Sequence, residues 1–387
     1  MATPGHRPAT GRWRLLLGEA GGAFGDLGTF LPYVVGALTV GALAPVGVLL
    51  GFGVFLVACG LFYGLPVAVQ PMKVVGAVLL TGDLDAATVA ATGLVMGAAL
   101  LALAATGTIG AIARWLPQSV GAGLQLGIGI SMALFGVALM DGAVWFGLLV
   151  LAGLLALMRV PGLPAAPVAI LLAVAGGHAA GLVGTPDWPA VTLTLPGFAL
   201  PDWRAAVDAI ERTVIPQLPL TLTNAVVVTA ALAHGLYGER AARVTPRNLL
   251  LTTGVANLAL APFGALPMCH GAGGLQAHYR FGARTGLAPV LLGLLLIGLA
   301  LGFADAATLL LGQIPPSAVG ALLIVAGADL ALSRRLFDAR RDCWPAIALT
   351  AGLAAFIDPA LALVTGWAVE TLRGPVKRRL KRLLRRA

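Results

Sequence analysis

Apolar stretches long enough to cross a lipid bilayer recur along this chain from Gly21 to Trp367. A helix needs about 20 mostly apolar residues to span the hydrocarbon core. Inside lipid every backbone N–H and C=O group must be paired within the protein, and an α-helix achieves this within one segment. Only 11% of the residues are charged, whereas soluble domains carry roughly 25%. The sequence therefore predicts an all-α polytopic membrane protein.

Breaks in the apolar pattern divide the chain into about fourteen membrane segments. In the first half these are residues 21–40, 45–62, 69–80, 86–106, 120–140, 143–158 and 165–183. In the second half they are residues 214–233, 249–263, 268–279, 287–303, 316–332, 344–356 and 359–372. The expected domains are an N-terminal tail (1–18), a first repeat (19–185), an external linker (186–212), a second repeat (213–372) and a basic C-terminal tail (373–387).

The distribution of basic residues predicts the orientation in the membrane. If the N-terminus is cytoplasmic, the outer loops carry only Arg204 and Arg212, and the other arginines fall on inner loops and on the two tails. This asymmetry predicts a multi-pass protein of the cell membrane with both termini cytoplasmic. The net charge of +9 owes much to the C-terminal tail. That tail lacks aromatic residues for base stacking, so we expect it to contact anionic lipid and not nucleic acid.

Missing motifs exclude several classes of function. Cys59, Cys269 and Cys343 are scattered in apolar surroundings, which favours neither a disulfide framework nor a zinc site. No glycine precedes a lysine, so the phosphate loop of ATP-driven pumps cannot form, and no His-Glu-x-x-His motif occurs. We therefore expect no metal, no cofactor, no catalytic residue and no enzymatic activity.

The third and tenth segments are too short to span the membrane as helices. Both begin with Pro-Met, at Pro71 and at Pro267. Short, proline-interrupted segments at matching places in two halves indicate an inverted repeat of about seven plus seven segments, with the binding site at the interface between the repeats. The alternative is a pair of ordinary kinked helices.

Proline suits the first turn of a helix, so half-helices are expected to start at Pro71 and Pro267. A helix N-terminus offers free N–H groups and partial positive charge, which together bind anions. Gly271, Gly273 and Gly274 would let an anion approach the backbone of the tenth segment closely. The two helix starts together predict an oxyanion site in mid-membrane.

Side chains beside these helix starts are expected to supply further donors, namely Gln70, Lys73 and His270. Lys73 is the only lysine before position 377, and a cation inside an apolar segment normally faces a cavity or the bundle interior. The alternative for Lys73 is a position near a helix end, from which the side chain snorkels to the interface. For His270 it is a packing role with both ring nitrogens satisfied.

The eighth segment carries a polar stripe. Gln217, Thr221 and Asn224 recur at helical spacing and therefore fall on one face. In lipid such a stripe turns toward protein or a cavity, which predicts a contribution to the same site. Hydrogen bonding between helices without any substrate is the alternative for Thr221 and Asn224.

Acidic residues in the apolar segments are candidates for coupling or charge balance. Glu19 and Asp26 are nearly aligned on an expected first helix. A carboxylate repels an anionic ligand, so Asp26 is expected to balance Lys73 or to bind the proton that couples transport. For Glu19 a place at the inner interface is favoured, and Asp329 is expected at that interface near Arg334.

Four stretches are more specific together than any one is alone. They are residues 25–32 (GDLGTFLP), 69–73 (VQPMK), 216–221 (PQLPLT) and 267–274 (PMCHGAGG), the last continuing into residues 279–284 (YRFGAR). Together they resemble the molybdate transporter family, a branch related to the sulfate permeases. The stretches are spread over both halves, so the resemblance covers essentially the whole transmembrane part.

The resemblance implies a uracil-permease-type fold with a core domain (segments 1–4 and 8–11) and a gate domain (segments 5–7 and 12–14). It implies a secondary active transporter, in homodimers, that imports molybdate by alternating access, with sulfate or tungstate as competitors. The expected substrate-binding residues are Gln70, Pro71, Met72, Lys73, Gln217, Thr221, Asn224, Cys269, His270, Gly271, Ala272 and Gly273. A sulfate or other anion carrier, and an anion channel without coupled transport, stay open as alternatives. A nucleobase carrier is disfavoured, because such sites usually need carboxylates and only Asp26 is available.

Overall fold

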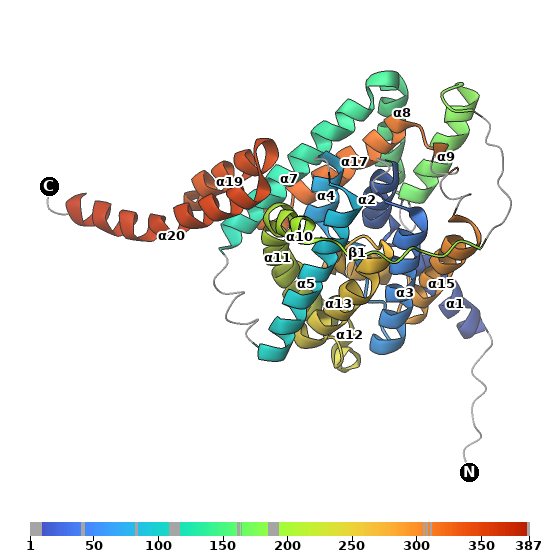
Figure 1. The fold of residues 1–387 in the computed structure, drawn as a ribbon, viewed down its shortest axis with the longest axis horizontal. Coiled ribbons are helices and arrows are strands. Elements are labelled where there is room, and N and C mark those ends of the chain that lie inside the picture. Colours follow the sequence, from blue (N-terminus) through green and yellow to red (C-terminus); the bar gives the residue numbers. More distant parts are fainter. Residues whose placement is uncertain are drawn as a thin grey trace, which may run out of the picture.

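The computed structural model describes residues 10–39, 43–81, 84–107, 117–160, 163, 165–184, 193–304, 306, 309 and 312–384. The described chain is mostly helical (Figure 1). Within the described residues, four helices are long and apolar enough to cross a membrane. They are α3 (Pro45–Tyr63), α5 (Ala86–Thr106), α7 (Gln118–Leu139) and the continuous helix Trp203–Ala241.

Two short strands pair at the centre of the fold. Strand β1 (Val69–Pro71) pairs antiparallel with β2 (Met268–His270), with Gln70 opposite Cys269. Helix α4 (Lys73–Thr81) follows the first strand and α14 (Ala272–Arg280) follows the second. The half-helices therefore begin after Pro71 and Pro267 and not at them, and the all-α expectation is wrong here. Each strand has a single partner, and an edge position tolerates the missing N–H of Pro71.

Glycine seams join two pairs of helices across the two halves. Helix α3 packs on α15 (Leu287–Gly302), and α5 packs on α13 (Pro246–Leu260). A methyl group on Gly293 would meet the Gly53 carbonyl oxygen at 2.6 Å, and one on Gly97 would meet that of Gly254 at 2.9 Å. Small residues at these crossings let the helix backbones approach closely, as membrane helices commonly do.

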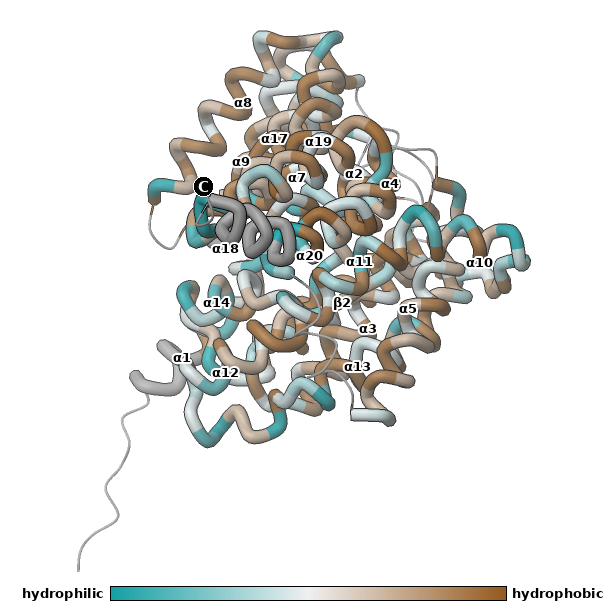
Figure 2. Tube along the Cα trace, turned by 90° about the vertical axis from the view of Figure 1, so that its left-hand side faces the viewer, coloured by the Kyte–Doolittle hydropathy of each residue, from teal (hydrophilic) through white to brown (hydrophobic). Residues whose placement is uncertain are grey.

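The helices form two groups (Figures 1 and 2). The strand-bearing group holds β1, β2, α3–α5, α13–α15, α1 (Thr10–Ala23), α2 (Leu27–Thr39), α10 (Trp203–Ala209), α11 (Ile215–Leu220) and α12 (Thr229–Tyr237). The flanking group holds α7, α8 (Val144–Leu157), α9 (Ala165–Ala179), α17 (Pro316–Ala331), α18 (Arg334–Phe337), α19 (Trp344–Phe356) and α20 (Pro359–Leu384). Helix α17 packs on α7 within its own group and on α2 across the boundary.

The first and last apolar segments differ from expectation. The first is divided at residues 24–26 into α1 and α2, so Glu19 and Asp26 do not share one helix as their spacing suggested. Helix α20 continues to Leu384, where a separate tail was expected from residue 373.

The helix that carries the expected polar stripe has two π-helical stretches, η2 (Ile210–Val214) and η3 (Thr221–Val228). Helix α10, within the expected external linker, runs without a break into the eighth segment. A π turn widens the helix and is frequent at functional sites.

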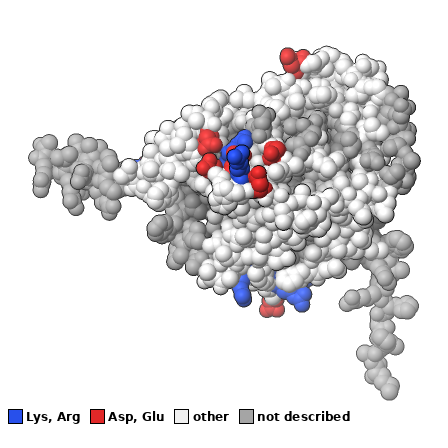
Figure 3. Space-filling view, viewed as in Figure 1, with Lys and Arg blue, Asp and Glu red and all other residues white. Residues whose placement is uncertain are grey.

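Apolar side chains cover much of the outside. Leucines on α8, α9 and α15 are largely exposed, among them Leu149 (61%), Leu171 (70%) and Leu294 (56%). Figure 2 shows hydrophobic residues along most of the helices. In the view of Figure 3 the charged side chains are few and gather in one central group and at the edges. This surface is the one expected of a polytopic membrane protein.

Candidate functional site

The paired strands β1 and β2 bring the starts of α4 and α14 to the centre of the strand-bearing group. The amide of Met72 donates to the Pro267 carbonyl at 2.9 Å, directly before α4. The strands run antiparallel, so the two helices leave the pair at opposite ends. Helix α4 follows the end of β1 at Pro71, opposite Met268, and α14 follows the end of β2 at His270, opposite Val69. The two helix starts therefore lie on either side of the strand pair.

Several N–H groups at these helix starts have no partner within the described part of the chain. They are the amides of Lys73 and Val75 in α4, and of Ala272, Gly273 and Gly274 in α14. The Val74 amide is occupied, because it donates to Oε1 of Gln217 at 2.8 Å. Gln217 in turn donates from Nε2 to Oγ1 of Thr221 at 2.9 Å. In this conformation Gln217 thus caps α4 from the neighbouring helix.

The glycines of α14 face different surroundings. A methyl group on Gly271 would overlap the Gln70 amide, and one on Gly274 would overlap the Asp26 carboxylate. Nε2 of Gln70 donates to Oδ1 of Asp26 at 2.6 Å. The exposed Gly273, by contrast, has no neighbour within 4 Å of an added methyl. Gln70 and Asp26 therefore support the helix start from inside, while Gly273 faces open space.

His270 is a packing residue and not a free donor in this structure. Its Nδ1 lies 3.0 Å from the Ala68 carbonyl, so Nδ1 carries the proton, and its Nε2 lies 2.9 Å from Oγ1 of Thr252. The ring packs beside Phe55 and Tyr63 and is 1% exposed. The expectation that His270 donates to a ligand is therefore not met, because both ring nitrogens are already bonded.

Lys73 opens α4 and is half-buried. Asp26, the partner expected from the sequence, accepts a hydrogen bond from Gln70.

The remaining predicted residues lie around this centre. Met72 and Cys269 are buried in or beside the strands, and Thr221 is buried against Gln217. Asn224 is only half-buried, because the π-helical stretch η3 begins at Thr221 and changes the spacing that the sequence implied. The polar stripe is thus partly broken.

Glu19 has a structural role that the sequence did not predict. Its side chain is fully buried, and Oε1 accepts a hydrogen bond from the Arg284 amide at 2.9 Å. Glu19 thus bonds the backbone that follows α14. Helix α1 is docked on the turn after α14, where Gly22 also accepts a hydrogen bond from Nδ1 of His278 at 2.6 Å.

Asn257 on α13 also escaped the sequence reasoning. It is 1% exposed, donates to the Met268 carbonyl at 2.7 Å and accepts from the Met268 amide at 2.9 Å. These two bonds pair the N–H and C=O groups of Met268 in β2. An asparagine inside an apolar segment was the available signal.

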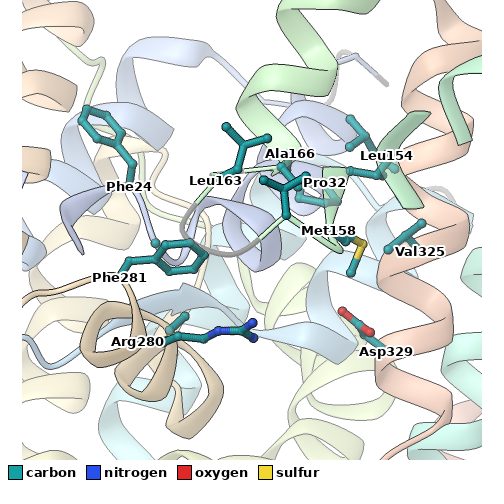
Figure 4. Close-up of a pocket in the computed structure, with 15 residues that line it drawn as sticks. Phe24, Pro32, Leu154, Met158, Leu163, Ala166, Arg280, Phe281, Val325 and Asp329 are labelled. Atoms are coloured by element: carbon teal, nitrogen blue, oxygen red, sulfur yellow. The ribbon is translucent and has the colours of Figure 1, made fainter. Parts of the chain in front are cut away.

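Two cavities lie between the helix groups. The first, of about 290 Å³, is lined by α2, α8, α14 and α17 and contains Arg280 and Asp329. Figure 4 shows Arg280 extending across it toward Asp329. The second, of about 300 Å³, is lined by α4, α7, α19 and η2 and contains Arg212 and Asp358. Asp329 was expected beside Arg334, whose side chain lies outside the described residues.

The donors at the two helix starts are of the kind that favours an anionic ligand. Among the described residues, no three His, Cys, Asp or Glu side chains group as metal ligands would. The unpartnered amides and the Lys73 ammonium are all donors, and donors at helix N-termini select anions.

Comparison with known proteins gives a consistent family match. The model of the family described as "Molybdate transporter of MFS superfamily" matches residues 18–132 and 210–330. The chain is 30% identical to molybdate transporter 2 of Arabidopsis thaliana, over 88% of this chain and 85% of the relative. It is 28% identical to molybdate transporter 1 of Chlamydomonas reinhardtii, over 82% and 84% of the two chains.

Solved structures share the fold at low identity. The transmembrane domain of the cyanobacterial bicarbonate transporter BicA matches with a TM-score of 0.66 at 18% identity, over 90% of this chain and 97% of that one. The murine anion transporter Slc26a9, in its inward-facing state, matches with a TM-score of 0.71 at 13% identity, over 96% and 70%.

Proposed function

Because the chain belongs to the molybdate transporter family, we propose that it is a secondary active transporter that imports a tetrahedral oxyanion, molybdate above all. The observation that carries this proposal is the pair of helix starts held together by β1 and β2. Unpartnered amides stand at both helix starts, and Lys73 opens α4. A dianion bound there meets fixed donors on two sides.

Magnitudes support a site of this kind. A micromolar Kd corresponds to about −8 kcal/mol. A hydrogen bond to a charged group contributes roughly 1.5–3 kcal/mol net, so a few amides suffice even after the ordering cost of binding is subtracted. The open side of Gly273 gives the anion access to the α14 backbone.

We assign the strand-bearing group to the core domain and the flanking group to the gate domain. Two features support this division. The packing of α3 on α15 and of α5 on α13 is the reciprocal pairing that an inverted repeat produces. The two cavities also lie along the boundary between the groups. Rocking of one group against the other would open these cavities in turn, in a homodimer with both termini cytoplasmic.

Uptake into proteoliposomes tests the proposal. Purified protein should accumulate radiolabelled molybdate, and titration calorimetry should show micromolar binding, with tungstate and sulfate as competitors. Lys73→Gln should weaken molybdate binding about tenfold or more, because one full charge leaves the site. Neither binding nor uptake of any of the three oxyanions would overturn the proposal, and large unitary currents would indicate a channel instead.

A further inference from the structure

An open groove of about 410 Å³ lies between helices α3 and α13 and shares no lining residue with the two cavities described above. Among the described residues that line it, Thr252 alone has an oxygen or nitrogen atom in its side chain. Val54, Phe62 and Val255 are 39%, 42% and 56% exposed, so the groove opens to the outside of the protein. For a membrane-spanning helix pair that outside is lipid hydrocarbon. The groove therefore suits an apolar chain.

One end of the groove reaches the membrane surface. Helix α3 has 19 residues and is therefore about 28 Å long, close to the hydrocarbon thickness of roughly 30 Å. Phe62 lies in the last turn of α3, so the groove ends at the level of the lipid headgroups. Arg243, an exposed residue between α12 and α13, donates from Nη1 to the Phe62 carbonyl at 3.0 Å. A guanidinium thus stands at the mouth of an apolar groove.

Positive charge dominates this mouth. The turn between α12 and α13 and the start of α13 carry three arginines, Arg240, Arg243 and Arg247, and one carboxylate, Glu239. All four residues are exposed. Among the described residues, the bond to Phe62 is the only hydrogen bond of Arg243. A guanidinium has five N–H donors, so most of them are available to a ligand. Charge and planar donors together favour a phosphate group.

We propose that this groove binds a phospholipid with a negatively charged headgroup: one acyl chain lies between α3 and α13, and Arg243 binds the headgroup phosphate. Lipid tails are as apolar as leucine, so the groove walls by themselves do not select one lipid over another. The selection comes from the headgroup, because basic pockets between membrane helices attract anionic lipids. A neutral lipid with the same chains enters the groove but is held less tightly.

The groove wall is also joined to the strand pair. The Thr252 hydroxyl lies 2.8 Å from the Tyr63 hydroxyl and 2.9 Å from Nε2 of His270, which belongs to β2. A ligand that binds only the folded protein stabilises it. The anionic lipid should therefore raise the melting temperature of the wild type more than the neutral lipid does.

Arg243 has a simpler role that the experiment has to separate. A basic side chain at the end of a helix bonds the last carbonyl groups and stabilises that end. Arg243→Gln keeps an N–H donor for the Phe62 carbonyl but removes the positive charge. Ala259→Trp leaves Arg243 in place and fills the groove, because Ala259 is an exposed lining residue. The two variants thus test the headgroup and the acyl chain separately.

Native mass spectrometry of the purified protein, titrated with dioleoyl phosphatidylglycerol or with dioleoyl phosphatidylcholine, measures the two affinities. The wild type should bind the anionic lipid about fivefold more tightly, the factor that one basic residue near a membrane surface contributes. Arg243→Gln should lose most of this preference and bind the neutral lipid as before. Ala259→Trp should bind both lipids more weakly. Arg204→Gln and Ala231→Trp, at exposed positions on α10 and α12, are the matched controls and should behave like the wild type.

The outcomes are independent of molybdate transport. Equal binding of the two lipids by the wild type, or an undiminished preference in Arg243→Gln, would indicate annular lipid only and overturn the inference. If Arg243→Gln does not fold, full binding of the anionic lipid by Ala259→Trp overturns it just as well. None of these measurements involves molybdate, so a failure of the proposed function leaves the lipid site standing, and a failure of the lipid site leaves the proposed function standing.

Discussion

At the scale of single residues, the start of α14 shows why three nearby glycines are not equivalent. Gly271 and Gly274 make room for Gln70 and Asp26, which are joined by a 2.6 Å hydrogen bond. Gly273 makes room for nothing within the protein. Two glycines thus accommodate neighbouring side chains, and the third leaves the helix backbone open on one side.

Alanine substitutions at these positions should separate the two roles. Gly274→Ala should lower the melting temperature, because its methyl group overlaps the buried Asp26 carboxylate. Gly273→Ala should leave the melting temperature unchanged or raise it slightly, since alanine is the better helix former. It should nevertheless weaken molybdate binding about tenfold, because its methyl group occupies the open side.

The measurements are thermal unfolding in detergent and titration calorimetry on the same preparations. Full molybdate affinity in Gly273→Ala would show that the anion does not approach α14 from this side. A stable Gly274→Ala protein would contradict the packing role of that glycine.

The sequence was informative about residue types but less so about their partners. It predicted a common site for Gln70, Lys73 and Gln217; in the structure Lys73 opens α4, Gln70 lies on the strand before it, and Gln217 bonds the Val74 amide. The sequence did not predict that Gln217 caps α4, nor that the two ring nitrogens of His270 bond Ala68 and Thr252. Those bonds join segments far apart in the chain, and one sequence carries no signal for them.

At the scale of elements, one side chain of helix α13 bonds the backbone of strand β2. Asn257 of α13 bonds both polar backbone groups of Met268. Its replacement leaves a buried N–H and a buried C=O without partners, each of which costs about 1–3 kcal/mol.

Asn257→Leu should therefore destabilise the protein by about 2 kcal/mol or more and weaken anion binding, because β2 sets the start of α14. Chemical unfolding in detergent measures the first effect. Asn248→Ala is the control, since the Asn248 side chain bonds the Arg243 carbonyl at an exposed site and should matter little. Equal stability of the Asn257 and Asn248 variants would refute the role of Asn257.

Helix α5 has a pH-sensitive N-terminus. Asp85 is its N-cap and accepts a hydrogen bond from the Thr88 amide at 2.8 Å. Hydrogen bonds from Thr88 lower the pKa of Asp85 below its usual value of 3.8. A lowered folded-state pKa means that the cap stabilises fully above the unfolded-state pKa and is lost as pH falls through the lower, folded-state pKa.

Asp85→Ala should therefore lower stability by about 1 kcal/mol at neutral pH, and its difference from the wild type should shrink below about pH 4. Asp85→Asn keeps an acceptor but has no charge to titrate, so its stability should not follow this pH dependence. Amide hydrogen exchange at the start of α5 across this pH range reports the effect. A difference that persists unchanged to pH 2 would contradict it.

The elements themselves were largely predictable from hydropathy. Helices α5 and α19 have the bounds that the sequence predicted, and α3 and α15 differ by one residue at one end. Lipid forces long apolar stretches into helices, so these bounds follow from local composition. The strands escaped prediction because three residues carry too little periodicity, and their pairing depends on a partner in the other half.

At the scale of the whole molecule, the two cavities along the boundary between the helix groups are the expected ends of the transport path. Cysteines placed at Ala277 in the first cavity and at Ser131 in the second should respond oppositely to molybdate when labelled with a small maleimide. One rate should rise as the other falls, because rocking that opens one cavity closes the other. Parallel changes at both positions would contradict alternating access.

The strand pair also constrains how the protein is made. Ala68 and the His270 ring that bonds it are 202 residues apart. At a synthesis rate of about 5–20 residues per second, β1 waits roughly 10–40 seconds for its partner. During that time the nascent first half sits in the bilayer with an unpaired strand edge and a buried Gln70–Asp26 pair that has nothing to pack on. Assembly of the centre thus has to wait for the synthesis of β2, and a chain truncated before β2 would keep one of the two helix starts and an unpaired strand edge.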